Sequence, residues 1–480
     1  MRGWIICSLL LLSLTGCIDF KGAADPFSYT PRTSHTVWRP PNEPQILDGC
    51  LDEDFEFLEE VEPLSLAEVL DLGLLNSPLT KMTWARSRMS AAEYGQSLQK
   101  DFLQAEGDAS YTRQRNAIFV LGQRQTIFQT VGSGDINFNY IFLDFGQTRY
   151  SSMAALESLY NADWLHNRAI QTVIQTLMTD YYDYLYQQER LISAEADVVN
   201  AQTTLDAVMA KLANGMADIS DKVQAVTSLK QTQLALVEQK QALHNSYTKL
   251  MSDMGVPAYL DIKFLRFPKK ITNFQPKELD ELIVTALKYR PDLQAAESQV
   301  QAGEDALTAA KRLYFPVFDG AATIGRAYFD MNRNDDFHWK VMAGMNMPLF
   351  QGFYIANTVR LAEGNLDQAR ARFEERKLTV LQDVVNYRDD VLLANEATHY
   401  AFEFLLAAEE EYRVLLDKYK VGTTTIVDVI KAQTDVADAQ ARNAEAQRDW
   451  YVSIADLSYG TGMLSLESAG TQFEDNYEKK

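Results

Sequence analysis

The feature that most constrains the fold of this chain is an internal duplication. A segment beginning at Ser65, SLAEVLDLGLLNSPL, matches ELDELIVTALKYRPDL in the second half of the chain. The match pairs Leu66 with Leu279, Glu68 with Glu281, Leu70 with Ile283, and Pro78 with Pro291. Self-similarity of this kind means that one supersecondary unit is built more than once. We therefore predict two similar units, one over residues 64–275 and one over 276–464.

Each unit shows the same order of sequence patterns. A helical run is followed by a turn-rich, β-like stretch, then by LDFG or LFQG, and then by two long helical runs separated by a glycine turn. In the first unit this order predicts strands at 107–120 and 136–146 and helices at 147–213 and 217–253. In the second unit it predicts strands at 318–331 and 338–350 and helices at 353–420 and 424–459.

The long helical runs carry coiled-coil periodicity. Apolar residues recur every seventh position in the first run, and a second set follows three positions later: Leu191, Val198, Leu205 and Leu212, then Ala194, Ala201 and Val208. Such a seam needs a partner helix. A helix of roughly 65 residues is on the order of 100 Å long. No compact globular core requires a rod of this length.

The predicted strands carry an apolar period of two instead. Ile136, Phe138, Tyr140 and Phe142 fall on one face of the first unit's second strand. In the second unit the apolar face holds Trp339, Val341, Ala343, Met345, Met347 and Leu349. Period alone leaves two interpretations open, because soluble hairpins packed on the helices and membrane-facing strands both alternate in this way.

The sequence after its first residues has no apolar run of 18 or more residues, so no helical membrane span is predicted. The other structure that can span a bilayer is a closed β-barrel. The smallest barrels have about eight strands, and four strands per chain cannot close one. A membrane interpretation therefore requires a homo-oligomer, which the unpartnered helical seams also favour.

Both ends of the chain differ from the repeats. Residues 1–16 have the pattern of a secretory signal peptide, and Leu14-Thr15-Gly16-Cys17 resembles the lipobox of bacterial lipoproteins, which predicts lipid attachment at Cys17. An ordinary signal peptide with an incidental cysteine is the alternative. Residues 17–63 form an acidic lead-in, in which Cys50 is free or paired, and residues 465–480 form a tail.

Composition excludes several function classes. The net charge of -21 leaves no basic face for nucleic acid. The five histidines are scattered, with no HExxH or CxxC spacing, so we predict no metal site. The pair Gly132 and Gly134 lacks the third glycine of a phosphate-binding loop, so no cofactor is predicted. The sequence shows no paired catalytic groups, so we predict that the protein is not an enzyme.

An unusual turn occurs twice, once in each unit. KLANGMADISDKVQA and KYKVGTTTIVDVIKAQ place Gly215 and Gly422 at equivalent positions, and Asp221 and Asp428 likewise. Glycine at the end of a long helix supplies the left-handed backbone that a side chain disfavours. A sequence that keeps this turn in both units needs it in both.

Taken in order, these phrases resemble the outer membrane factor family, the TolC-like channels of tripartite efflux pumps and type I secretion systems. KYRPDLQAAESQV, YKVGTTTIVDVI, AAKRLYFP and LFQG are its most specific parts, and the resemblance covers residues 64 to 464. It implies a mainly α fold with a transmembrane β-barrel: long helical hairpins form a periplasmic α-barrel, and four strands per chain contribute to a twelve-stranded barrel of a homotrimer. It also implies a passive exit duct that docks with a periplasmic adaptor protein and an inner membrane pump. The trimer would lie in outer membrane lipid.

The resemblance also assigns functional residues. Tyr419 matches the gate tyrosine of the family, and Asp428 matches an aspartate that forms a cation-binding ring at the pore entrance. Two positions depart from the family pattern, because Thr424 replaces an arginine and Lys431 replaces a second aspartate. The hairpin ends, which resemble those that meet the adaptor, are Asn214, Gly215, Met216, Val421, Gly422 and Thr423.

Plainer interpretations of these residues remain. Asp428 is also a favourable charge at a helix start, and both glycine turns are also ordinary helix caps. The alternative function is a lipid-anchored coiled-coil spacer without a channel. The sequence does not indicate whether the cargo is a drug, a metal ion or a protein.

Overall fold

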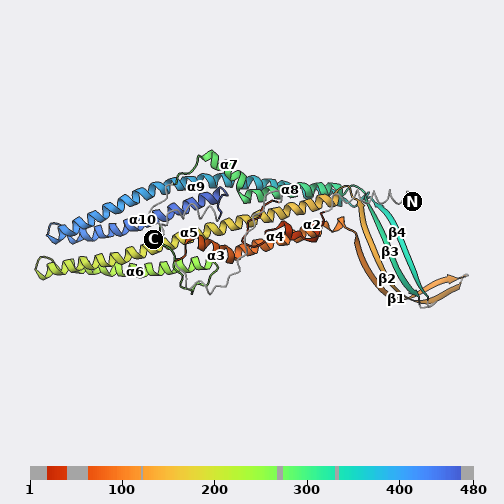
Figure 1. Ribbon diagram of the computed structural model, residues 1–480, viewed down its shortest axis with the longest axis horizontal. Helices are drawn as coiled ribbons and strands as arrows, with labels where there is room; N and C mark the ends of the chain where they lie inside the picture. The colour runs from red at the N-terminus through yellow and green to blue at the C-terminus, as the bar shows by residue number, and fades with distance from the viewer. Residues whose placement is uncertain (1–18, 41–62, 121–122, 268–273, 330–333, 466–480) are drawn as a thin grey trace.

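The computed structural model describes residues 19–40, 63–120, 123–267, 274–329 and 334–465. The protein is an elongated helical rod, and a four-stranded sheet bends away from one end of it (Figure 1). Within these described residues, no helix is both long and apolar enough to cross a membrane.

The predicted duplication is present in three dimensions. The first repeat contains α3 (Leu66–Asn76), α4 (Pro78–Ser97), β1 (Gln104–Val120), β2 (Gln123–Leu143), α5 (Gln147–Ala213) and α6 (Ile219–Asp253). The second contains α7 (Leu279–Tyr289), α8 (Pro291–Arg312), β3 (Val317–Phe329), β4 (Asn334–Asn346), α9 (Tyr354–Lys420) and α10 (Ile426–Gly460). The helices α5 and α9 have 67 residues each, and α6 and α10 have 35 each. Equal lengths place the two hairpin ends at one end of the rod.

Local sequence explains where these helices begin. Ser65 and Glu68 form the predicted capping box of α3, with the Ser65 amide 2.7 Å from the Glu68 carboxylate. Pro78 and Pro291 stand at the first turns of α4 and α8, where proline removes no helical hydrogen bond. The turns that lead into α5 and α9 each contain two successive residues with positive φ, Phe145-Gly146 and Gly352-Phe353. These turns redirect the chain from the sheet into the rod.

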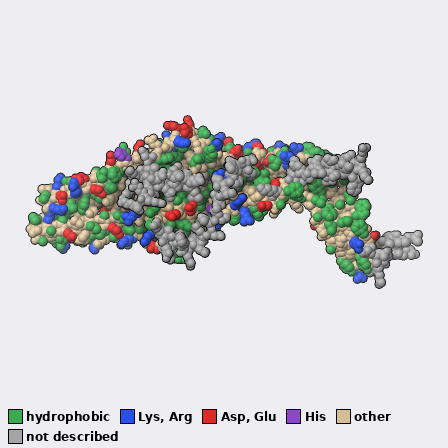
Figure 2. Space-filling model, viewed as in Figure 1, with side chains coloured by type: hydrophobic (Ala, Val, Ile, Leu, Met, Phe, Trp, Pro, Cys, Tyr) green, Lys and Arg blue, Asp and Glu red, His purple; other side chains and the backbone are tan. Residues whose placement is uncertain are grey.

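The sheet is antiparallel throughout, in the order β1-β2-β3-β4. The central pair joins the two repeats, because β2 pairs with β3 from Val131 opposite Phe329 to Leu143 opposite Phe318. Large apolar side chains are exposed on this single layer, and those of Trp339, Val341 and Met345 are 69%, 72% and 61% exposed. Figure 2 shows hydrophobic side chains along the sheet and mixed charges over the rod.

The strands differ from their predicted bounds, most of all in β2. This strand begins at Gln123, whereas the sequence predicted a start at 136 and a connecting loop before it. Residues 123–131 pair with 112–120 of β1. The segment GQRQTIFQTVGSGD, which the sequence predicts as the connection between the two strands, is itself mostly strand, because backbone pairing across a hairpin does not require an apolar face. The last strand also ends earlier than predicted, at Asn346 instead of 350.

The helices form a wall whose neighbours change along the rod (Figure 1). Beside the sheet, α4, α5, α8 and α9 lie in that order, and toward the far end the order is α6, α5, α10 and α9. The main core lies in the middle, where α3 and the returning chain pack on α5, around Leu70, Leu177 and Leu250. Leu177 fits so closely on α3 that a Cβ on Gly73 would lie 2.2 Å from it.

Candidate functional site at the ends of the helical hairpins

Both hairpins end in the same backbone motif. In the first, the amide of Gly215 donates to Leu212 at 3.0 Å and that of Met216 donates to Lys211 at 2.9 Å. In the second, Gly422 donates to Tyr419 and Thr423 to Lys418, both at 3.0 Å. These are Schellman caps, which satisfy the last carbonyl groups of a helix. Gly215 and Gly422 have φ values of 70° and 86°, which explains why glycine stands at both positions.

The returning helix α10 begins with a second capping device. Thr425 and Asp428 form a capping box, in which the Asp428 amide donates to the threonine hydroxyl at 3.3 Å and the Thr425 amide donates to the carboxylate at 3.2 Å. Thr424, one of the departures from the family pattern, also donates to this carboxylate, at 2.8 Å. Asp428 is therefore a cap as well as a gate candidate.

The charge of Asp428 is maintained by these contacts. The carboxylate is exposed, and hydrogen bonds from Thr425 and Thr424 lower its pKa, helped by the nearby charge of Lys431. The replacement of a family aspartate by Lys431 thus places a cation beside Asp428. An exposed ionised carboxylate at a helix end can interact with a cation from solution.

Tyr419 is in a different environment from Asp428. Its side chain is only 3% exposed and packs with Val208, Ala225, Ile426 and Val429. Among the described residues its buried hydroxyl has no hydrogen-bond partner. Burial raises the pKa of Tyr419, and the charge of Asp221 adds to the effect.

A contact that the sequence does not predict joins the two hairpins. Lys211, in the last turn of α5, places its ammonium 3.8 Å from the centre of the Tyr419 ring and donates to the Tyr419 carbonyl group. A cation over an aromatic face is attracted by the ring's quadrupole. A lysine in a last helical turn is common, so the sequence alone gave no reason to select it. The structure brings Lys211, Tyr419 and Asp221 together, and leaves Asp428 on the exposed side.

The KYRPDL phrase, whose role the sequence did not define, forms a buried ion network. Arg290 is 1% exposed, and its guanidinium donates to both carboxylate oxygens of Asp292, at 3.0 and 2.7 Å, and to Asp383 at 2.9 Å. Arg168 of α5 lies 4.0 Å from Asp292. Burial opposes ionisation of Asp292, but the hydrogen bonds from Arg290 and the charge of Arg168 outweigh it, so the pKa of Asp292 is lowered. This network connects helices of both repeats.

Other predicted features stand apart from this region. Cys17, the predicted lipid attachment site, and Cys50 lie outside the described residues. Over the part of the chain that the structure describes, no group of three or more histidine, cysteine, aspartate or glutamate side chains is placed to hold a metal ion.

Comparison with known proteins identifies the family. The family model for outer membrane efflux proteins matches residues 69–256 and 282–462, which are the two repeats. The chain is 24% identical to outer membrane protein TolC of Salmonella enteritidis, over 57% of this chain and 52% of that protein. It is 22% identical to outer membrane protein OprJ of Pseudomonas aeruginosa, over 86% of this chain and 87% of that protein.

Solved structures give the same result for the fold. The chain superposes on the Campylobacter jejuni CmeC outer membrane channel with a TM-score of 0.75 and 17% identity, over 91% of this chain and 98% of that one. The long helices and four antiparallel strands match that channel fold, which confirms the predicted fold class. The alternative of a spacer without a channel is set aside, because the family match spans both repeats, strands included. The chain belongs to the outer membrane efflux protein family, and is a TolC-like outer membrane channel with a periplasmic extension, not an enzyme.

Proposed function

We propose that three copies of the chain form one passive duct, with a twelve-stranded barrel in the outer membrane and a helical tube in the periplasm. The observation that carries this proposal is the sheet. In the described sheet, β1 pairs with β2 alone and β4 pairs with β3 alone, so both outer strands present an unpaired edge. Unpaired edges with exposed apolar side chains call for pairing with another copy in lipid.

The outer helices of the wall support the same arrangement. Towards the hairpin ends α6 and α9 flank the wall, and both expose apolar side chains at coiled-coil spacing or near it. On α6, Leu234 and Val237 are 61% and 63% exposed, and on α9 Leu393 is 64% exposed. Closing the tube would bury these side chains between neighbouring copies.

The hairpin ends would form the periplasmic entrance. Asp428 would contribute one carboxylate per copy to a cation-binding ring. The contact between Tyr419 and Lys211 would stabilise the closed state of the entrance. Among the described residues of one chain the buried hydroxyl of Tyr419 has no hydrogen-bond partner, which supports a partner from a neighbouring copy or from a rearranged state. The capped ends at Asn214–Met216 and Val421–Thr423 would meet a periplasmic adaptor, which links the duct to an inner membrane pump that supplies the energy.

The start of the described chain supports lipid attachment at Cys17. Asp19, two residues later, accepts hydrogen bonds from Tyr29 at 2.8 Å and Tyr94 at 2.9 Å. The next residue, Phe20, packs its ring on Phe102, just before β1 begins. These contacts hold Asp19 and Phe20 near the start of the first strand, where the proposed barrel would enter the membrane.

Native mass in detergent tests the proposal. The protein is extracted from separated outer membranes, with and without Cys17→Ala, which removes the proposed lipid. We expect both forms to require detergent and to run as trimers, because the barrel, not the lipid, holds the protein in the bilayer. Release of Cys17→Ala into buffer as a monomer or dimer would contradict the barrel. A wild-type mass without attached lipid would contradict only the anchor.

A further inference from the structure

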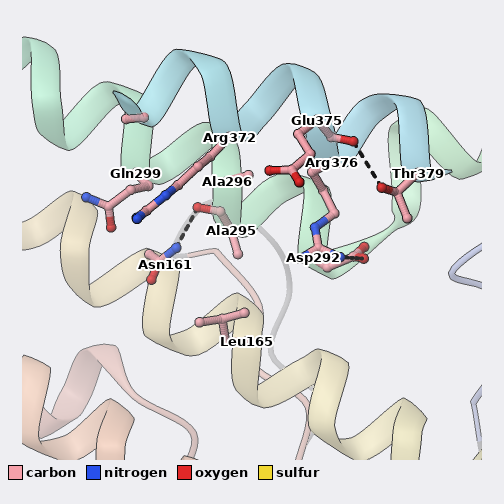
Figure 3. Close-up of a pocket in the computed structure, with 11 residues that line it drawn as sticks. Asn161, Leu165, Asp292, Ala295, Ala296, Gln299, Arg372, Glu375, Arg376 and Thr379 are labelled. Atoms are coloured by element: carbon pink, nitrogen blue, oxygen red, sulfur yellow. Dashed lines mark hydrogen bonds and ion pairs between the residues drawn. The ribbon is translucent and has the colours of Figure 1, made fainter. Parts of the chain in front are cut away.

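A polar pocket lies in the helical wall between the sheet and the hairpin ends. It has a volume of about 560 Å³ and is lined by α5, α8 and α9 (Figure 3). Arg372 and Arg376, one helical turn apart on α9, both extend into it, and Gln299 of α8 and Asn161 of α5 reach it from the other sides. The pocket is formed by one copy of the chain.

The guanidinium of Arg372 has donors to spare. Among the described residues it makes no hydrogen bond or ion pair, and Figure 3 shows it pointing between Gln299 and Asn161. Asn161 donates its amide to the Ala295 carbonyl at 2.6 Å, which fixes this wall of the pocket. A guanidinium presents N–H donors in a planar fork that fits a carboxylate with two parallel hydrogen bonds.

The second arginine is only partly neutralised. The carboxylate of Asp292 already accepts two hydrogen bonds from Arg290, so Arg376 contacts it only as an ion pair at 3.8 Å. The lining itself carries two arginines, at 372 and 376, and two acids, at 292 and 375. Because Asp292 is already held by Arg290, Arg372 is the arginine of the lining whose guanidinium makes no ion pair among the described residues. This guanidinium is therefore the group in the pocket that can bind an anion.

The remaining lining defines the size and character of the ligand. Leu165, Ala295, Ala296 and Ala369 supply apolar surface, and the volume falls in the range that holds small organic molecules. Glu375, whose carboxylate also reaches the pocket, disfavours a densely charged ion such as phosphate. We propose that this pocket binds a small organic carboxylate, with Arg372 and Gln299 on the carboxylate and the apolar side chains on the rest of the molecule.

Calorimetric titration of the purified full-length protein with succinate tests the site. We expect the wild type to bind succinate and Arg372→Gln to bind it at least tenfold more weakly. Arg370→Gln is the matched control, because Arg370 lies two residues away, pairs with Glu304 at 2.7 Å and does not line the pocket. This control should stay within twofold of the wild type. Glu375→Gln should bind more tightly, since it removes a repelling charge.

Three outcomes would overturn the proposal. In the first, the wild type does not bind succinate. In the second, Arg370→Gln and Arg372→Gln weaken succinate binding equally. In the third, the wild type binds inorganic phosphate more tightly than succinate. The native mass of each sample is measured separately. A monomer that still binds succinate through Arg372 would contradict the trimeric duct but not the site. A trimer that does not bind succinate would contradict the site but not the duct.

Discussion

The buried titratable side chains show how single residues set the pH response of this protein. Asp163 of α5 is fully buried, and one of its carboxylate oxygens has no hydrogen-bond partner among the described residues, while Ser87 donates to the other. Burial raises the pKa of Asp163 to about 8. One turn later, burial lowers the pKa of His166 to about 4. The folded protein therefore favours the neutral form of both side chains.

We predict that Asp163→Asn removes a loss of stability between pH 7 and 8. An unfolded aspartate titrates near pH 3.9, so between roughly pH 4 and 8 the folded chain holds one more proton than the unfolded chain. The free energy of unfolding then falls as pH rises, by at most about 1.4 kcal/mol per pH unit. Asparagine carries no charge and can keep a hydrogen bond to Ser87. Denaturant unfolding of both proteins at the two pH values measures the difference.

The matched control for this prediction is Asp438→Asn, which removes the same charge from an exposed pair with Arg442. It should leave the pH dependence unchanged. His166 contributes equally to both proteins, and in this interval it is neutral in the folded chain and mostly neutral in the unfolded chain. An unaltered pH dependence in Asp163→Asn would show that Asp163 is not the titrating group.

We predict that Asp428→Asn weakens the block of single-channel current by divalent cations added from the entrance side, by about tenfold, or about 1.4 kcal/mol. The expected reason is the loss of three ionised carboxylates from the proposed ring. Asp438→Asn again serves as the control, because Asp438 lies roughly 15 Å further along α10 and pairs with Arg442. Equal block in Asp428→Asn and the wild type would restrict Asp428 to its capping role.

At the scale of elements, the helix ends are fixed by backbone conformation. Gly215, Gly255, Gly422 and Gly462 all have positive φ, and each follows the end of a long helix. An added Cβ at Gly215 or Gly422 would meet no atom within 4 Å. The need for glycine at the two hairpin ends is therefore one of backbone angle, not of space.

We predict that Gly215→Ala and Gly422→Ala each lower the free energy of unfolding by about 1 to 2 kcal/mol, the cost of a left-handed residue with a side chain. Gly364→Ala is a control for which we expect the opposite sign. Gly364 lies inside α9, and an added Cβ there would also meet no atom within 4 Å. Alanine at that helical position should stabilise by about 0.5 to 1 kcal/mol. Guanidinium unfolding measures all three, and a loss of the same size in Gly364→Ala would refute the backbone explanation.

At the scale of the molecule, the Arg290 network connects the repeats. Arg290 stands between α7 and α8, contacts Asp383 of α9 and the Gly460 carbonyl at the end of α10, and shares Asp292 with Arg168 of α5. The start of α8, the helix α9 and the end of α10 thus meet at the buried guanidinium of Arg290, and α5 of the other repeat joins them through Asp292. Removing Arg290 leaves Asp383 without its ion-pair partner among the described residues, and leaves Asp292 only the longer ion pairs to Arg168 and Arg376.

We predict that Arg290→Ala lowers the free energy of unfolding by about 3 to 5 kcal/mol, the usual cost of breaking a buried ion pair. Arg370→Ala, which breaks the exposed pair with Glu304, should cost at most about 1 kcal/mol. Chemical unfolding of the two variants, measured side by side, gives the comparison. Similar losses in both would mean that the buried network does not hold the repeats together.

Much of this architecture was determined by the sequence alone. The duplication, the long helices and the glycine turns are local patterns, because periodicity and backbone preference act over a few residues. The family phrases gave the channel fold, and the capping box at Ser65 was readable from its spacing. The roles of Tyr419 and Asp428 and the lipid at Cys17 remain predictions.

Only the tertiary structure decided which distant residues meet. It placed Lys211 against Tyr419, completed the network around Arg290, and extended β2 to Gln123 through pairing with β1. It also brought Arg372 to a pocket whose other walls come from α5 and α8. Such contacts join segments far apart in the chain, and the energy of a charge depends on its burial and its partners. Neither quantity is encoded in a short stretch of sequence.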